Sequence, residues 1–407
     1  MQGAGVLKAE LSTLVTQHGR LLRLRNSRLY GRIFKRNKSL FITGNHTVLY
    51  QQGGDFFPAL FAAIDTAGHQ LLLEYYIIHD DIIGRRFAAA LIDAVARGVQ
   101  VCLIYDYLGS FDTPASYFEQ LEAQGVQLLC FNKLRWGRGL GWLDKRNHRK
   151  TAVIDGSIAF LGGLNIGDEY SGFGDSTDRW RDCGMHVTGP VVEELRKLYW
   201  DTWQHEHYPI PVQPAFEPPA QTSAGTDTII LISGGPHHRR SFIKQAYRLA
   251  ITGAQESLII VTPYFLPGLR LVRTMLKAVK RGVSVTLILP GQSDVPILKI
   301  VGHAYLALLL KAGVAVYERQ GTVLHAKLML VDECWVQIGS ANFDQRSFHR
   351  NFETNLVVES QEFSGNVLRM LQDDILKSRM VALDEHTVRK WYEPLLELLF
   401  STLNRFL

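Results

Sequence analysis

Cysteine is scarce in this chain of 407 residues, and no two cysteines have the spacing of a metal site. The four cysteines, Cys102, Cys130, Cys183 and Cys334, stand 28, 53 and 151 positions apart. Zinc sites and dithiol centres are typically built on C-x-x-C pairs, which this sequence does not contain. We therefore expect a reducing compartment, no structural metal and no cofactor.

Long apolar runs are also missing. The most apolar stretch, residues 300–310, is eleven residues long and contains His303, whereas a membrane-spanning helix needs about 20 residues. The first residues lack the compact apolar segment of a secretory signal. The sequence thus predicts an intracellular protein that is at most peripheral to a membrane.

Acidic residues are nearly absent from the first forty positions. Residues 1–40 hold nine Lys or Arg and one acid, Glu10, so this arm carries a charge of +8 and the remainder −3 of the net +5. Such an arm indicates a polyanionic partner, either nucleic acid or an anionic membrane. Leucines interleaved with the arginines at roughly helical spacing favour the membrane. A solvated helix packed on its own domain is the alternative.

The rest of the composition is that of a folded protein. Hydrophobic residues make up 46% of the chain and charged residues 20%, which excludes a disordered chain and allows a large buried core. Five of the fourteen prolines lie between Pro209 and Pro219, where neither a helix nor a central strand would tolerate them. We expect a linker at residues 207–226.

The same order of elements recurs on both sides of this linker. In the first half, an apolar run at 71–78 precedes a helical stretch that ends at Ala96, followed by an Arg-Gly-Val sequence and a second apolar run. In the second half, the run at 258–261 precedes a helical stretch that ends at Lys280, with Arg-Gly-Val again after it. This alternation predicts an α/β fold, duplicated as two pseudo-twofold-related domains with mixed sheets flanked by helices. The predicted units are a basic arm (1–44), a first domain (45–206), the linker and a second domain (227–407).

Each half contains the pattern His-x-Lys-x4-Asp. Its residues are His148, Lys150 and Asp155 in the first half and His325, Lys327 and Asp332 in the second. An asparagine follows each histidine by seventeen positions, at Asn165 and Asn342. Two copies in register with the repeat are a strong signal, because an isolated short motif is often coincidence.

Strand geometry places these groups near one another. His and Lys two positions apart point to the same face of a strand. If Asp155 and Gly156 form a two-residue hairpin turn, His148 lies opposite Gly163, and the same register in the second half puts Ser340 opposite His325. A slip of one residue would turn one group to the wrong face.

Two facing half-sites of this kind suit a phosphodiester. The lysines supply positive charge, while Asn165, Asn342 and Ser340 can bind the phosphate oxygens. One neutral histidine can attack phosphorus while the other, protonated, gives its proton to the leaving oxygen, so that no metal is required. Asp182 and Glu353 are the candidates that fix the orientation of the histidines.

Two of these assignments have structural alternatives. Asp155 and Asp332, grouped with the catalytic residues, are also typical turn residues, because aspartate forms local hydrogen bonds there. Asp182 follows Arg181, so an ion pair with a neighbouring arginine is the alternative to a histidine partner.

The duplicated motif, with Gly162-Gly163-Leu164-Asn165 and Gly339-Ser340-Ala341-Asn342, resembles the phospholipase D superfamily. Within it, the chain is most similar to bacterial cardiolipin synthases of the short type, without N-terminal membrane spans. Further segments carry this resemblance, which extends over nearly the whole chain after about residue 45: Phe160 to Gly167, Trp180-Arg181-Asp182 with Gly189-Pro190, Tyr264 to Pro267, Gln292 to Pro296, and Asn351 to Asn355. Gly163 departs from the superfamily pattern, which has serine there, but matches the double glycine of the synthases.

The resemblance implies a phospholipase D-like fold and a covalent phosphatidyl-histidine intermediate, with His148 the nucleophile and His325 the acid and base. The two roles can be exchanged without any change in the pattern. It also implies phosphatidylglycerol as donor and acceptor, cardiolipin and glycerol as products, an anionic phospholipid membrane as partner and no nucleic acid. The expected location is the cytoplasmic face of the cell membrane.

A segment before His148 combines tryptophans, arginines and leucines among glycines. We expect Arg135, Trp136, Arg138 and Trp142 to contact the membrane, since such residues favour its interface. An ordinary packed loop is the alternative. Two other functions stay open: a phosphodiester hydrolase acting on phospholipid or nucleic acid, and a non-catalytic module that binds anionic membranes.

Overall fold

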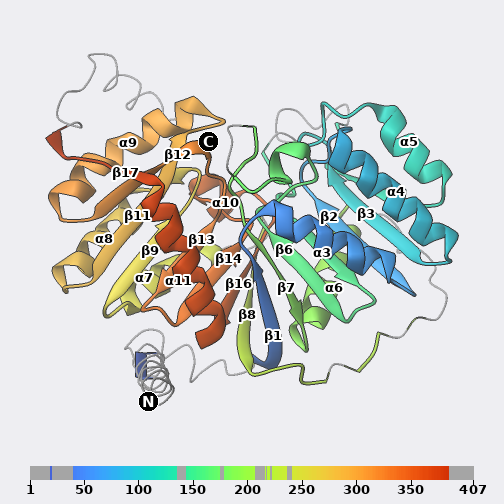
Figure 1. Ribbon diagram of the computed structural model, residues 1–407, viewed down its shortest axis with the longest axis horizontal. Coiled ribbons are helices and arrows are strands. Elements are labelled where there is room, and N and C mark those ends of the chain that lie inside the picture. Colours follow the sequence, from blue (N-terminus) through green and yellow to red (C-terminus); the bar gives the residue numbers. More distant parts are fainter. Residues whose placement is uncertain are drawn as a thin grey trace, which may run out of the picture.

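The computed structural model describes residues 19–20, 40–134, 144–174, 178–206, 216, 218–220, 222–235 and 241–384. The two halves form two lobes that lie side by side (Figure 1). The first half contains β1 (Ile42–Tyr50), α3 (Gly53–Asp65), β2 (Gln70–Tyr75), α4 (Ile82–Ala96), β3 (Gln100–Asp106), α5 (Ala115–Ala123), β4 (Gln127–Phe131), β5 (Thr151–Ile154), β6 (Ile158–Gly162), η3 (Asp168–Tyr170), β7 (Gly184–Thr188) and α6 (Val191–His205).

The second half contains β8 (Asp227–Gly234), α7 (Phe242–Gly253), β9 (Ser257–Val261), β10 (Phe265–Leu266), α8 (Leu269–Lys280), β11 (Ser284–Gln292), α9 (Pro296–Lys311), β12 (Ala315–Val323), β13 (Leu328–Val331), β14 (Trp335–Gly339), β15 (Phe343–Asp344), α10 (Gln345–His349), β16 (Glu353–Glu359), α11 (Gln361–Leu376) and β17 (Ser378–Met380). Both helices expected from the repeat end as predicted, at Ala96 and Lys280. The described helices include none that is both long enough and apolar enough to cross a bilayer.

One continuous sheet of 15 strands connects the two halves. Counted outward from the antiparallel pair β1 and β8, the first half runs β1-β7-β6-β5-β2-β3-β4 and the second β8-β16-β14-β13-β9-β11-β12, with β17 added at the edge. Parallel pairs such as β2 with β3 lie beside antiparallel pairs such as β5 with β6. The α/β class, the duplication and the mixed pairing agree with the prediction, although the halves share one sheet rather than holding separate sheets.

The strands are buried on both faces, and alternate residues belong to different cores. In β2, Leu72 packs in a central core that includes α6 and α11 and spans both halves. Its neighbours Leu71 and Leu73 pack instead with α3, α4 and α5. The second half repeats this arrangement with α7, α8 and α9. Because successive side chains of a strand point to opposite faces, one apolar run supplies both cores.

The hairpin after each motif differs in register from the prediction. Asp155 and Gly156 do occupy the centre of a tight turn, because the Ser157 N–H donates to the Ile154 carbonyl at 3.0 Å and both central residues have positive φ. Beyond the turn, however, Ile154 pairs with Ile158 rather than Ser157. The second hairpin shows the same shift, with Val331 opposite Trp335. Each loop therefore has one residue more than expected, a slip that apolar strands buried on both faces tolerate.

Arg20, from the basic arm, contacts the second half. Its guanidinium forms ion pairs with Glu256, at 2.7 Å, and with Glu333 in the turn between β13 and β14. Apart from residues 19–20 and 40–44, the arm lies outside the described residues, as does most of the predicted linker.

Candidate active site

Each motif histidine lies on a segment that pairs with the other half of the chain. The backbone N–H of His148 donates to the Phe352 carbonyl at 2.9 Å, and that of His325 donates to the Arg181 carbonyl at 2.8 Å. Parallel bridges join Asn147 to Phe352 and Arg181 to Leu324. Each histidine segment thus pairs with the opposite half of the chain.

The histidine side chains also contact the opposite half. Nδ1 of His148 lies 3.0 Å from Glu353, and Nδ1 of His325 lies 2.7 Å from Asp182. Both carboxylates were candidates from the sequence, and the structure places each of them against the histidine of the other half. Arg181 binds Asp374 at 2.9 Å instead of the Asp182 carboxylate, so the Arg181 alternative for Asp182 does not hold.

The carboxylates and histidines are buried together. Burial raises the pKa of Glu353, but His148, Lys150 and a hydrogen bond from Ser340 outweigh it and leave that pKa below its usual value. Lys327 and His325 outweigh burial in the same way and lower the pKa of Asp182. A carboxylate with a lowered pKa therefore faces Nδ1 of each histidine, which favours the tautomer with a free Nε2. Nζ of Lys327 also lies 2.7 Å from Nδ1 of His325.

Burial favours the neutral form of both histidines. Burial lowers the pKa of His148 to about 4, although Glu353 acts in the opposite direction. Burial and the neighbouring Lys327 also lower the pKa of His325, against the effect of Asp182. A neutral imidazole is the form that can act as a nucleophile or a base.

The two lysines are buried beside their histidines. Nζ of Lys150 donates to the His148 carbonyl at 2.7 Å, and Nζ of Lys327 donates to the His325 carbonyl. Lys327 also lies 3.6 Å from Asp182. Burial lowers the pKa of both lysines, that of Lys150 to well below its ordinary value. The two lysine side chains do not line the cavity, and they contact the histidine backbone and, for Lys327, the Asp182 carboxylate instead.

A cavity of about 240 Å³ collects the remaining polar groups. His148, His325, Asn165 and Asn342 all line it. Among the described residues, Nδ2 of Asn165 and Oδ1 of Asn342 have no hydrogen-bond partner. Buried amide atoms of this kind are costly unless a ligand completes their bonding.

Several residues of this cavity had no role predicted from the sequence. They are Tyr76, Ile77, Arg146, Tyr170, Trp180, Tyr264, Asp294, Leu298, Asp344, Arg346, Ser347 and Asn351. Trp180, Tyr264, Asp294 and Asn351 lie in segments that carried the family resemblance, which was the available signal. Arg146 and Arg346 had none, because arginines are common on protein surfaces.

Ser340 lies behind the histidines rather than in the cavity. Its hydroxyl donates to Glu353 at 2.5 Å and accepts from the Thr354 N–H at 3.0 Å. Its position therefore disagrees with the expected binding of the phosphate and favours a role in holding Glu353. At the matching position, a Cβ on Gly163 would overlap the Asp182 carboxylate. Glycine at position 163 thus leaves room for the Asp182 carboxylate.

Asp155 and Asp332 do not line the cavity either. The Asp155 carboxylate accepts the backbone N–H groups of Gly68, His69 and Gln70 at 2.7–2.8 Å. Asp332 accepts those of residues 255–257 at 2.8–3.2 Å. These bonds favour the turn alternative for both residues, in which each aspartate joins a hairpin to the loop before a neighbouring strand.

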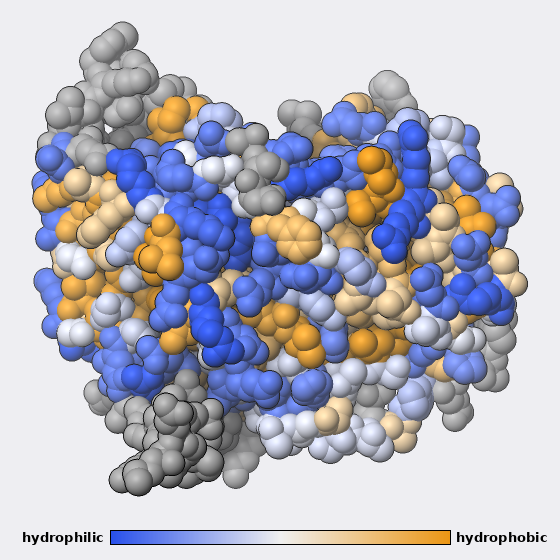
Figure 2. All heavy atoms as spheres, in the orientation of Figure 1, coloured by the Kyte–Doolittle hydropathy of each residue, from blue (hydrophilic) through white to orange (hydrophobic). Residues whose placement is uncertain are grey.

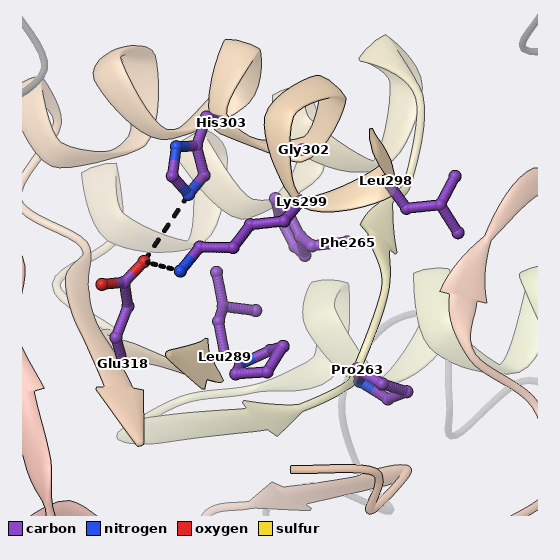
Figure 3. Close-up of a pocket in the computed structure, with 9 residues that line it drawn as sticks. Pro263, Phe265, Leu289, Leu298, Lys299, Gly302, His303 and Glu318 are labelled. Atoms are coloured by element: carbon purple, nitrogen blue, oxygen red, sulfur yellow. Dashed lines mark ion pairs between the residues drawn. The ribbon is translucent and has the colours of Figure 1, made fainter. Parts of the chain in front are cut away.

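A second, smaller pocket lies under α9 (Figure 3). It measures about 20 Å³, room for roughly one water. Lys299 and His303 point toward Glu318, at 3.0 and 3.6 Å, so the charges of this pocket are paired. Its other lining residues are mainly apolar, and it lacks the convergent polar groups of the larger cavity.

One group among the described residues has the composition of a metal site: His79, Asp81 and Glu169 place ligand atoms within 4.8 Å of one another. Both oxygens of Asp81 already accept backbone N–H groups, from Gly84 and Asp168. Nδ1 of His79 lies 3.5 Å from Glu169. We interpret the group as an ion-pair cluster that fixes the start of α4.

The predicted membrane-contact residues, Arg135, Trp136, Arg138 and Trp142, lie outside the described residues. Their contact with a membrane stays a prediction from the sequence.

Comparison with known proteins agrees with this geometry. The family described as "Cardiolipin synthase, PLD-like domain" matches residues 60–194 and 247–375, which contain both histidine motifs. A cardiolipin synthase of Geobacillus kaustophilus is 34% identical over 346 residues, which cover 85% of this chain and 69% of that protein. Cardiolipin synthase A of Pseudomonas fluorescens is 35% identical over 349 residues, 84% of this chain and 71% of that protein.

A solved structure shows the same fold. The phosphatidylserine synthase of Haemophilus influenzae matches with a TM-score of 0.67 over 92% of this chain and all of that one, at 12% identity. The resemblance seen in the sequence is confirmed. The chain belongs to the cardiolipin synthase family of the phospholipase D superfamily.

Proposed function

We propose that this protein transfers a phosphatidyl group from one phosphatidylglycerol to another, which yields cardiolipin and glycerol. The observation that carries the proposal is the pair of histidines in one cavity, each with Nδ1 against a buried carboxylate of the opposite half. Two histidines held in this way can form and then resolve a covalent intermediate without a cofactor.

In the first step, Nε2 of His148 attacks the phosphorus of the donor. The P–N bond forms, the bond from phosphorus to the glycerol oxygen breaks, and His325 gives a proton to that oxygen, so that glycerol leaves. Glu353 stabilises the positive charge that develops on the His148 ring. The geometry assigns the nucleophile to His148 no more strongly than to His325, and we retain the assignment that the family resemblance implies.

In the second step, the primary hydroxyl of another phosphatidylglycerol replaces glycerol. It gives its proton to His325 while its oxygen bonds to phosphorus and the P–N bond to His148 breaks. Cardiolipin leaves and both histidines return to their starting forms. Asp182 holds the proton-bearing His325 through both steps.

Proton transfer in the first step requires a protonated His325. Its pKa is lowered by burial and by Lys327. A bound phosphodiester anion beside the ring acts in the opposite direction, because a nearby negative charge favours the charged form of histidine. Binding of substrate thus prepares the acid in our proposal.

The partner in this proposal is an anionic phospholipid membrane, with the protein bound peripherally at its cytoplasmic face. The basic arm supports this proposal, because each cation near an anionic leaflet contributes on the order of 1 kcal/mol. Its leucines also suit an interface.

The test uses phosphatidylglycerol vesicles with a chelator, and mass spectrometry of the lipids. We expect cardiolipin and released glycerol. The variants His148→Ala and His325→Ala should lose turnover, because either change removes the nucleophile or the proton donor. Phosphatidic acid as the sole product would replace the transferase with a hydrolase. Vesicle binding by wild type and His148→Ala, with turnover by neither, would favour a non-catalytic module.

A further inference from the structure

The two half-sites match in their acid-base groups but differ beside the cavity. His148 and His325, and Asn165 and Asn342, occupy the same places in the repeat. The bridge from Ile78 to Ile166 in the first half corresponds to the pair Phe265 and Phe343 in the second. Ile77, which precedes Ile78, therefore occupies the place of Tyr264, and both residues line the cavity.

A second difference lies next to Tyr264. Leu71 pairs with Val101 in the first half, and Leu258 pairs with Val285 in the second. Ser110 stands nine residues after Val101, and Asp294 stands nine residues after Val285. Ser110 is 4% exposed and satisfied by the backbone, since its hydroxyl donates to the Tyr76 carbonyl and accepts from the Ile78 N–H. Asp294 lines the cavity, where it accepts a 2.5 Å hydrogen bond from the Tyr264 hydroxyl.

The charged residues around the cavity also differ between the two half-sites. Arg146 and Arg346 line it and act electrostatically on Tyr76, whose ring packs edge-on against His148 at 5.0 Å. The negative charge of Asp294 acts on His325. Asp106 balances Arg146 at 3.3 Å, so Arg346 is the cation on the His148 side, whereas Asp294 is the carboxylate on the His325 side.

A transferase with two substrates in different roles needs such a difference. A phosphate group is attracted to the cationic end and repelled by a carboxylate. The terminal hydroxyl groups of the acceptor glycerol are neutral and can donate a charge-assisted hydrogen bond to that carboxylate. The anionic end thus suits the incoming alcohol, beside the histidine that takes its proton.

We infer that Asp294, held by Tyr264, selects acceptor alcohols that carry a second hydroxyl next to the reacting one. The reacting hydroxyl gives its proton to His325, and the neighbouring hydroxyl donates to Asp294. This inference rests on the proposed function and names a specificity determinant within it. Glycerol-based headgroups satisfy both contacts, whereas simple alcohols satisfy one.

The test is a competition between two small acceptors. Wild-type protein and Asp294→Asn receive phosphatidylglycerol vesicles with equal concentrations of 1,2-propanediol and 1-propanol, and the two phosphatidyl products are compared by mass spectrometry. Wild type should favour the diol. Asp294→Asn should reduce the diol-to-propanol ratio by about tenfold, the size of one charge-assisted hydrogen bond, and Tyr264→Phe should change it in the same direction.

Asp373→Asn is the matched control. Asp373 lies on α11, paired with Lys377 and half exposed, and does not line the cavity. This variant should keep the wild-type ratio. A wild-type ratio in Asp294→Asn would overturn the inference while leaving the transferase intact. Failure of the wild type to release glycerol from phosphatidylglycerol would overturn the proposed function, and the inference with it.

Discussion

The histidines of this site depend on carboxylates from the opposite half of the chain. Glu353 lies against His148, and Asp182 against His325. The four side chains are nearly buried, with His148 the most exposed at 12%. Residues separated by 205 and 143 positions thus form each functional pair.

Replacing either carboxylate by its amide tests this pairing. We expect Glu353→Gln and Asp182→Asn to lower kcat by roughly 100-fold or more, because an amide no longer enforces the required tautomer or stabilises the charged ring. Turnover of phosphatidylglycerol is the measurement, with urea unfolding to establish that each variant folds. A rate within twofold of wild type would contradict a catalytic role of the pair.

The buried neutral histidine predicts a dependence of stability on pH. Burial lowers the pKa of His148 to about 4 in the folded protein, against 6.5 for an unperturbed histidine. Between these values the unfolded chain binds more protons, so the free energy of unfolding falls as the pH drops through this window. We expect wild type to lose about 2 kcal/mol more than His148→Gln between pH 7 and 4.5.

Urea unfolding at the two pH values measures this difference. His69→Gln is a suitable control, since its ring lies at the protein surface, stacked on Phe216, rather than in the site. Equal losses in wild type and His148→Gln would show that His148 does not carry the effect.

The sequence predicted the chemical groups of the site better than their contacts. His148, His325, Asn165 and Asn342 were found because the repeat displays them twice. The pairing of the carboxylates was not predictable from spacing, because it depends on how the two halves join. The position of Ser340 was missed for the same reason as the strand register, since one extra loop residue changes which side chain lies opposite the histidine.

At the scale of elements, each β-hairpin after a motif is tied to its neighbour by an aspartate. Asp155 joins the turn between β5 and β6 to the residues before β2, and Asp332 does the same before β9. Carboxylates that accept several backbone N–H groups make strong, charge-assisted hydrogen bonds. This contact repeats in both halves, which explains why the aspartate belongs to the motif without lining the cavity.

Substitution of Asp155 separates a structural from a catalytic role. We expect Asp155→Ala to lower the free energy of unfolding by about 2 kcal/mol, because three backbone donors lose their acceptor. The kcat of the folded fraction should stay within about threefold of wild type, since the turn contacts no residue of the cavity.

Asp155→Asn keeps one side-chain oxygen and should retain part of the lost stability. Chemical unfolding and turnover per folded molecule provide the two readings. A large fall in kcat at unchanged stability would return Asp155 to the catalytic group.

At the scale of the whole molecule, one twisted sheet makes both half-sites part of a single body. The pair β1 and β8 joins the halves, and the core around α6 and α11 spans the join. The exposed surface of this body is a mixture of polar and apolar residues, without one dominant apolar face in the view of Figure 2. Attachment to a membrane through this face would therefore need charge as well as apolar contact.

The basic arm is the segment to remove. Deletion of residues 1–40 should weaken sedimentation with phosphatidylglycerol vesicles, and the difference from wild type should shrink as salt is added, because exposed charges are screened. Vesicles of neutral phosphatidylcholine serve as the control. Unchanged binding to the anionic vesicles would favour the alternative, a helix packed on its own domain, for which Arg20 already has two acidic partners.

The architecture of each half was largely predictable from the sequence, whereas the pairing of β1 with β8 that connects the halves was not. Alternating apolar runs and helices, the Arg-Gly-Val repeats and the proline-rich linker indicated two α/β units. The union of both units in one sheet depends on the pairing of β1 with β8, and the apolar run within β8 does not reveal that β1 is its partner. Local periodicity reports the burial of a strand and does not identify the strand beside it.

Each histidine segment pairs with the opposite half of the chain. This arrangement resembles the interface of a symmetric dimer whose two subunits have been joined into one polypeptide. In a dimer of identical subunits, every substitution appears twice, so both half-sites must stay alike. A single chain is free of this constraint. It can keep histidine and asparagine at both positions while it holds isoleucine at one place, Ile77, and tyrosine at the matching place, Tyr264. Joining the copies thus permits two like histidines to serve two unlike roles, one beside the donor and one beside the acceptor.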